Sequence, residues 1–170
     1  PLNRRPYRRG VSRPQAAGGG VLKRALPTPI ARAMTEDEVL RLLRDAGALL
    51  EGHFILSSGL RSPKYLQCAR LLMDPTRAER AARALAARIP PEIREQIDLV
   101  ASPAMGGVII GHEMGRALGC PAIFVERPQG RFELRRGFAI DPGARVLLVE
   151  DVVTTGLSSR EAIAAGASDF

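Results

Sequence analysis

The chain has few of the residue types that usually build metal centres, disulfide frameworks or membrane spans. It has no tryptophan, two cysteines and two histidines, and aromatic residues make up 4% of its 170 residues. No apolar run approaches the roughly 18 residues of a membrane-spanning helix. Cys68 and Cys120 are far apart in the sequence, so we interpret them as buried thiols of a reduced, cytoplasmic protein. We interpret His53 and His112 as structural, because no Ser/His/Asp or Cys/His set accompanies them.

Acidic residues are absent from the first 33 residues. This segment holds eight basic residues, whereas the rest of the chain has 25 − 8 = 17 basic residues against 18 acidic ones. The net charge of +7 therefore comes from the tail, and nucleic-acid binding by the remaining domain is not indicated. We predict a disordered tail over residues 1–33 and a domain over 34–170. Contact with RNA or an acidic partner, a transit peptide and no role at all remain open for the tail.

The hydrophobic pattern predicts an α/β protein. Thr35 and Glu38 form the capping box of a first helix, and Asp74 with Pro75 opens a second helix that runs to about Ile89. Beyond this point short apolar segments alternate with helical ones, which is typical of an open parallel sheet flanked by helices. The expected strands are 97–102, 121–127 and 145–150, the expected helices are 105–119 and 158–166, and 131–140 is expected to be extended.

The stretch "EDVVTTGLSS" lies where a strand passes into a helix. Ligands of such sheets bind at the carboxyl ends of the strands, and a glycine-containing turn at the start of a helix presents backbone N–H groups to an anion. Glu150 and Asp151 would repel a phosphate, but carboxylates bind sugar hydroxyls well. The stretch therefore indicates a phosphoribosyl ligand, with a serine-capped helix after an exposed acid pair as the alternative.

Two further segments are candidate parts of the site. "SPAMGGV" (102–108) is a second strand-to-helix turn where backbone could approach an anion, although it lacks the ending of a P-loop and the spacing of a dinucleotide fingerprint. Residues 126–138 carry four arginines and are broken by glycine and proline. They form either a solvated hairpin or a mobile lid that brings positive charge to a leaving group.

With these residues the chain resembles the type I phosphoribosyltransferases and, among them, the orotate phosphoribosyltransferases. "VLLVEDVVTTG" is similar to the signature for phosphoribosyl pyrophosphate (PRPP), and "GHFILSSG", "SPAMGGVIIGHEMGRALG" and "ELRRGF" narrow the resemblance. It runs from about residue 36 to 166. It implies a small N-terminal hood beside the sheet and transfer of phosphoribose from PRPP to orotate, giving orotidine 5′-monophosphate and pyrophosphate in pyrimidine biosynthesis. It also implies Mg²⁺ bound through PRPP and a cytoplasmic homodimer with shared active sites.

The resemblance also implies a role for individual residues. Glu150 and Asp151 hold the ribose hydroxyls, and Thr154, Tyr65 and Leu66 contact orotate. A cis peptide is expected at Ala104–Met105, and Arg127 and Arg131 belong to the mobile loop. The 5′-phosphate loop comprises Val152, Val153, Thr154, Thr155, Gly156, Leu157 and Ser158, and the pyrophosphate loop comprises Pro103, Ala104, Met105, Gly106 and Gly107.

Some residues depart from the pattern of the family. The chain has only two lysines, Lys23 and Lys64, so the mobile loop lacks the lysines of many relatives. Gly106 and Ser57 likewise stand where some relatives have lysine, and Leu157 replaces a small residue. The family continues with further strands and an arginine that grips orotate, so we expect a C-terminally truncated chain with an exposed sheet edge. Another PRPP-dependent purine or uracil transferase, a non-catalytic PRPP-binding regulator and an inactive fragment remain alternatives.

Overall fold

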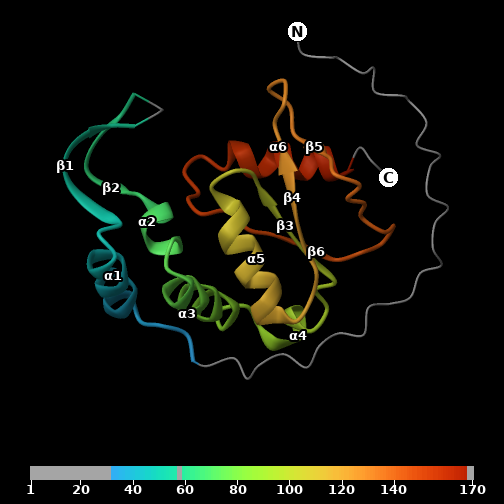
Figure 1. Cartoon of the computed structure of the whole chain (residues 1–170), viewed down its shortest axis with the longest axis horizontal. Helices are drawn as coiled ribbons and strands as arrows, with labels where there is room; N and C mark the ends of the chain where they lie inside the picture. Colours follow the sequence, from blue (N-terminus) through green and yellow to red (C-terminus); the bar gives the residue numbers. More distant parts are fainter. Residues whose placement is uncertain (1–31, 57–58, 168–170) are drawn as a thin grey trace, which may run out of the picture.

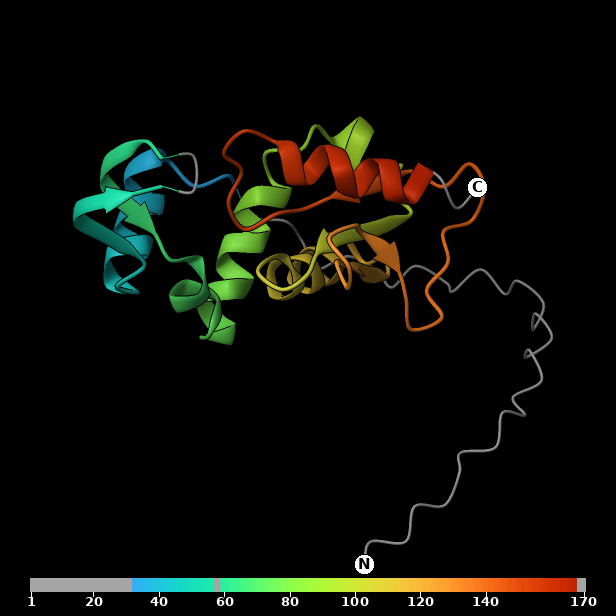
Figure 2. The same ribbon diagram turned by 90° about the horizontal axis from the view of Figure 1, so that it is seen from above.

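The chain forms a small N-terminal unit beside a larger unit in which helices cover both faces of a sheet (Figures 1 and 2). The computed structural model describes residues 32–56 and 59–167. Most of the predicted tail, residues 1–31, therefore lies outside the described part. In that part no helix is both long and apolar enough to cross a membrane.

The N-terminal unit consists of helix α1 (Glu36–Asp45) and an antiparallel hairpin of β1 (Leu49–Ile55) and β2 (Arg61–Leu66). The predicted capping box is present. The Thr35 hydroxyl accepts a hydrogen bond from the Glu38 N–H, and the Glu38 carboxylate accepts one from the Thr35 N–H. The helix ends where Gly47 takes a left-handed backbone conformation, with φ of 62°. This unit corresponds to the expected hood.

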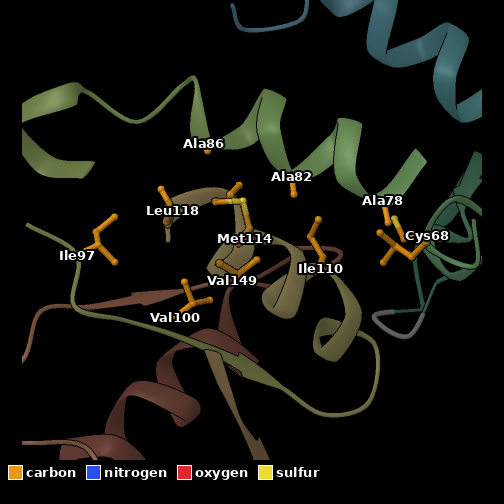
Figure 3. Packing of buried hydrophobic residues seen from close by; sticks show 12 residues of the cluster. Cys68, Ala78, Ala82, Ala86, Ile97, Val100, Ile110, Met114, Leu118 and Val149 are labelled. Atoms are coloured by element: carbon orange, nitrogen blue, oxygen red, sulfur yellow. The ribbon is translucent and has the colours of Figure 1, made fainter. Parts of the chain in front are cut away.

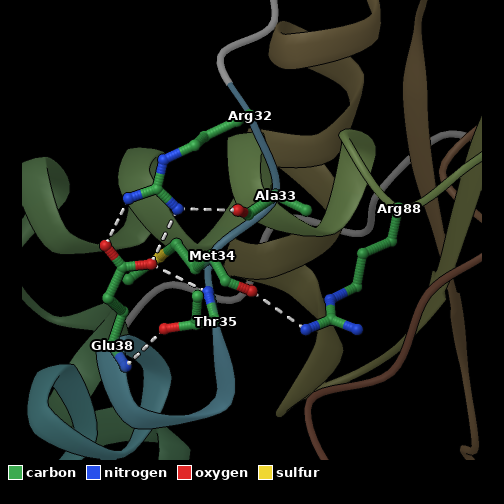
Figure 4. Close-up of polar contacts among 6 residues, drawn as sticks. All are labelled: Arg32, Ala33, Met34, Thr35, Glu38 and Arg88. Carbon is green, nitrogen blue, oxygen red and sulfur yellow. Dashed lines mark hydrogen bonds and ion pairs between the residues drawn. The ribbon is translucent and has the colours of Figure 1, made fainter.

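Two arginines tie the start of α1 to its surroundings (Figure 4). The Arg32 guanidinium donates to both carboxylate oxygens of Glu38, at 2.9 and 2.6 Å. Arg88, which follows helix α3 (Pro75–Ala86), donates to the carbonyl of Met34 at 3.0 Å. The hood is thereby joined to the larger unit by a directed hydrogen bond.

The sheet has four strands in the order β5-β4-β3-β6. Three of the strands are parallel, as predicted: β3 (Leu99–Pro103), β4 (Ala122–Glu126) and β6 (Val146–Leu148). The two-residue strand β5 (Glu133–Leu134) is antiparallel to β4. Within the described residues β6 pairs with β3 alone and lies at the edge of the sheet. The extended segment predicted over 131–140 thus forms a strand only at residues 133–134, near its beginning.

Helix α5 (Gly107–Leu118) packs in two directions. Ile110, Met114 and Leu118 meet a row of alanines on α3, formed by Ala78, Ala82 and Ala86 (Figure 3). Its other side carries Gly107, Gly111 and Gly115, all buried. A Cβ at Gly111 would lie 2.5 Å from the hydroxyl of Ser102 on β3, so only glycine permits this close approach. The close approach sets the start of α5 beside the end of β6.

The remaining helix α6 (Leu157–Ala167) lies on the opposite face of the sheet from α5 (Figure 2). Its Ala162 packs with Val125 and Phe132 in a second apolar cluster. Some predicted boundaries were wrong by one to three residues. The second helix ends at Ala86 instead of about Ile89, and α6 begins at Leu157 instead of 158. Two short helices, α2 (Cys68–Leu72) and α4 (Pro91–Arg94), were not predicted, because each is too short to show a helical period.

Candidate active site

The two adjacent acids lie directly beyond the end of β6. Glu150 is half-buried and Asp151 is exposed. The Sγ–H of Cys68, from α2, donates to the Asp151 carbonyl at 3.4 Å. Burial, and secondarily the negative charge of Asp151, raises the pKa of the Cys68 thiol, so this group stays protonated and able to donate. The acid pair is therefore fixed between the sheet and the helix that follows the hood.

A polar pocket of about 240 Å³ opens beside the acids, and residues 152–158 form most of its wall. Gly156 has a φ of 70°, which turns the chain into α6. Among the described residues the backbone N–H groups of 152–156 donate to no protein acceptor, whereas the Leu157 N–H donates to the Thr155 hydroxyl at 3.3 Å. Free N–H groups at the start of a helix are suited to bind an anion such as phosphate. The pocket is lined by Arg127, Glu150, Val152, Thr154, Thr155, Gly156, Leu157, Ser158 and Glu161.

The second predicted loop, residues 103–107, touches the acid pair. The peptide between Ala104 and Met105 is cis, as expected from the resemblance. Gly106 lies so close to Asp151 that a Cβ there would be 2.7 and 2.8 Å from the two carboxylate oxygens. A side chain at position 106 would displace this carboxylate. Glycine at this position, where some relatives have lysine, is thus part of how Asp151 is placed.

The arginine-rich segment has one ion pair to helix α6 and one between two of its own residues. Arg127 pairs with Glu161 of α6, and its guanidinium lies 4.1 Å from the centre of the Phe132 ring. Arg136 donates to both oxygens of Glu126 at 3.1 and 2.8 Å. This contact, above all, lowers the pKa of the Glu126 carboxyl. The segment therefore forms the predicted hairpin, with most of its residues exposed, and Arg127 anchors it to α6.

An apolar cavity of about 220 Å³ lies on the other side of the acids, between α1, α2, α3 and α5. Leu66, predicted to contact orotate, lines this cavity together with Cys68, Glu150 and Asp151. Tyr65, its predicted companion, lines neither this cavity nor the polar pocket. Its ring packs on Phe54 of the hairpin, with 5.6 Å between the ring centroids. Arg131 also lies outside both linings, and in the described residues it has no ion-pair partner.

Two contacts of the site were not anticipated from the sequence. Ser159 donates to the Glu150 carboxylate at 2.7 Å, and Glu161 receives Arg127. Both residues follow the predicted loop within α6, where a hydroxyl or an acid is ordinarily interpreted as a solvated helix face. The contact between Ser159 and Glu150 could have been anticipated only from the position of Ser159 in the first turn of a helix that follows the strand end.

Comparison with known proteins assigns this arrangement to a family. The chain is 73% identical over 132 residues to an orotate phosphoribosyltransferase of Sphingopyxis alaskensis, covering 78% of this chain and 67% of that protein. It is 71% identical to one of Novosphingobium aromaticivorans, again over 78% of this chain and 68% of the relative. The chain belongs to the orotate phosphoribosyltransferase family. No family model matches the chain.

The folds of solved orotate phosphoribosyltransferases agree with this assignment. The enzyme of Aeropyrum pernix aligns with a TM-score of 0.61 at 29% identity, over 76% of this chain and 73% of that one. The UMP synthase of Leishmania donovani shares the fold with a TM-score of 0.62 at 22% identity, over 80% of this chain and 29% of that one. Members of the orotate phosphoribosyltransferase family are pentosyltransferases of pyrimidine biosynthesis, and the predicted fold and family are both confirmed.

Proposed function

We propose that the chain transfers the 5-phosphoribosyl group of PRPP to orotate, giving orotidine 5′-monophosphate and pyrophosphate. The observation that carries this proposal is the contact between its two loops. Asp151, one of the two acids predicted to hold the ribose, lies against Gly106 of the pyrophosphate loop. The polar pocket opens beside its neighbour Glu150. A ligand with a phosphate at one end, a pentose in the middle and a pyrophosphate at the other matches this order of groups.

The 5′-phosphate would lie in the polar pocket against the N–H groups of residues 152–156. The positive end of the α6 dipole and the hydroxyls of Thr154, Thr155 and Ser158 add to this anion site. Glu150 and Asp151 would accept hydrogen bonds from the ribose hydroxyls.

Orotate would lie toward the hood. Leu66 and the apolar cavity offer a surface for a flat ring, and Thr154 offers a hydroxyl on the side of the phosphate loop. Tyr65 is 41% exposed on the hairpin, so its predicted contact with orotate requires the hairpin to approach the acids. We propose this approach as part of substrate binding.

The pyrophosphate would occupy the loop from Pro103 to Gly107. We propose that Mg²⁺ enters with PRPP, since this ion usually keeps several waters and binds through one or two carboxylates and substrate phosphates. In this proposal the ion is held through PRPP, and the exposed carboxylate of Asp151 lies beside the loop without binding the ion directly. When bound, the ion neutralises charge on the departing pyrophosphate.

In the reaction the bond from the anomeric carbon to pyrophosphate breaks, and a bond to a ring nitrogen of orotate forms. The transition state is oxocarbenium-like, so the protein contributes positioning, water exclusion and charge stabilisation. Arg127, at the edge of the polar pocket, and Arg131 would supply positive charge to the leaving group. To reach the pyrophosphate, Arg127 must first leave its ion pair with Glu161.

We further propose a cytoplasmic homodimer, in which the arginine-rich segment reaches the site of the second subunit. A cytoplasmic location is supported by Cys68, whose contact with Asp151 requires a reduced thiol. Analytical ultracentrifugation with and without PRPP tests the dimer.

Calorimetric titration with PRPP and Mg²⁺, followed by orotate, tests the function together with a steady-state assay of orotidine 5′-monophosphate formation. We expect PRPP to bind first and orotate to bind the resulting complex. Binding of PRPP without binding of orotate would limit the chain to a PRPP-binding protein. Turnover with a purine base or uracil in place of orotate would contradict the proposed substrate.

A further inference from the structure

Helix α6 contacts three different parts of the site through three consecutive residues. Ser159 donates to the Glu150 carboxylate at 2.7 Å, Arg160 donates to the Thr155 carbonyl at 3.2 Å, and Glu161 pairs with Arg127. The second contact fixes the phosphate loop, and the third holds the arginine-rich segment. The first acts on one of the two acids that face the ribose in the proposed function.

Glu150 is the acid that most needs such a partner. It lines both the apolar cavity and the polar pocket, so its carboxylate stands at the boundary between them. Its side chain has one more rotatable bond than that of Asp151, which lies against Gly106. Without a partner, the Glu150 carboxylate would be free to swing between the two cavities.

We propose that Ser159 is a positioning residue for ribose binding, acting through Glu150. Its hydroxyl occupies one carboxylate oxygen, Oε2, and leaves Oε1 directed to the ribose hydroxyls. A hydrogen bond to a charged, half-buried group is among the stronger ones in proteins, so the geometry of Glu150 depends on it. This inference rests on the proposed function, since it assumes that the pocket binds a phosphorylated pentose.

The test compares Ser159→Ala and Ser159→Thr with the unchanged chain, using ribose 5-phosphate and inorganic phosphate as probes in calorimetric titrations. Ser159→Ala is expected to weaken ribose 5-phosphate binding about five- to tenfold and to leave phosphate binding unchanged. Ser159→Thr keeps a hydroxyl and is expected to restore most of the affinity. In the transfer assay Ser159→Ala should raise the KM for PRPP more than it lowers kcat.

If Ser159 had only a structural role, Ser159→Ala would lower the Tm. Under the positioning role the Tm is expected to stay unchanged or to rise slightly, because alanine is the better helix former. The Ser159→Ala change should also have no further effect on ribose 5-phosphate binding when Glu150→Ala, which removes the acceptor, is already present. Equal weakening of both probes, or full ribose affinity in Ser159→Ala, would overturn the proposal. Failure of the unchanged chain to bind ribose 5-phosphate and PRPP would instead overturn the proposed function.

Discussion

The position of Asp151 depends on two small residues, Gly106 and Cys68. Gly106 lets the Asp151 carboxylate lie against the pyrophosphate loop, and the cysteine at position 68 reaches the carbonyl of the same aspartate. Some relatives have lysine at position 106. In this chain glycine at position 106 lets the two loops meet, and in the proposed function Mg²⁺ and arginine supply the positive charge for the pyrophosphate.

Replacing Gly106 by alanine is expected to weaken ribose 5-phosphate binding by about tenfold without lowering stability. The three atoms nearest to the new Cβ would all belong to the Asp151 carboxylate, the end of a flexible side chain, which therefore moves away from its site. Calorimetric titration and a thermal melt measure the two effects. Gly52→Ala is the matched control, because a Cβ there makes ordinary contacts of 3.5 Å with Phe54. Unchanged ribose affinity in Gly106→Ala would contradict this account.

Removing the charge of Arg127 is expected to lower kcat for transfer by about one to two orders of magnitude, since the proposed function assigns this residue to the leaving group. Arg127→Lys should recover only part of this loss, because a single ammonium replaces the fork of guanidinium donors. Steady-state kinetics measures both. Arg145→Ala serves as the control, since Arg145 precedes β6 at its opposite end. A normal kcat in Arg127→Ala would remove this residue from the chemistry.

Helices position these residues. Helix α5 depends on close packing against the sheet, and helix α1 depends on the hydrogen bonds that cap its first turn. The glycine row of α5 lets the helix approach β3 and so carries the pyrophosphate loop to Asp151. The capping box and Arg32 hold the first turn of α1, on which the hood is built.

Gly111→Ala is expected to destabilise the fold by about 1–3 kcal/mol through overpacking. The new Cβ would lie 2.5 Å from the Ser102 hydroxyl and 2.7 Å from its Cβ, and Ser102 is fully buried on a central strand. Urea denaturation measures the change. Ile109→Ala, at a site 47% exposed on the same helix, is expected to change stability far less. Equal effects of the two substitutions would argue against close packing at Gly111.

The start of α1 is expected to stay capped in acid. Hydrogen bonds from Arg32, and then from Thr35, lower the pKa of Glu38 from 4.5 to about 2. A lowered pKa in the folded state means that the contribution of Glu38 to stability is complete above about pH 4.5 and is lost as the pH falls toward 2. An NMR titration of the Glu38 carboxyl carbon measures this, and Glu38→Gln should abolish the pH dependence in that window. A midpoint near 4.5 in the folded chain would contradict the contact.

In the whole molecule the proposed ligand would touch both the hood and the larger unit. The acids end β6, the pyrophosphate loop precedes α5, the phosphate loop precedes α6, and Leu66 belongs to the hood hairpin. A ligand that binds such a site stabilises the folded state as a unit.

PRPP with Mg²⁺ is expected to raise the free energy of unfolding by about 2.7 kcal/mol at a concentration 100 times its Kd. Thermal melts over a series of PRPP concentrations measure this shift, and ribose 5-phosphate without a pyrophosphate should give a smaller one. The double change Glu150→Gln with Asp151→Asn is the control that should abolish most of the shift. A Tm independent of PRPP would contradict binding to the folded chain.

The α/β class and the helix starts at Thr35 and Asp74 were predicted from the sequence and are confirmed, and the phosphate loop was predicted from the same kind of local pattern. These features depend on neighbours along the chain: a cap, a hydrophobic period, or a turn leading into a helix. Only the tertiary structure decided that Gly106 touches Asp151, that Ser159 holds Glu150 and that Arg127 is held by Glu161. Those contacts join residues brought together by packing of helices on the sheet, and no local pattern records which side chains will meet there.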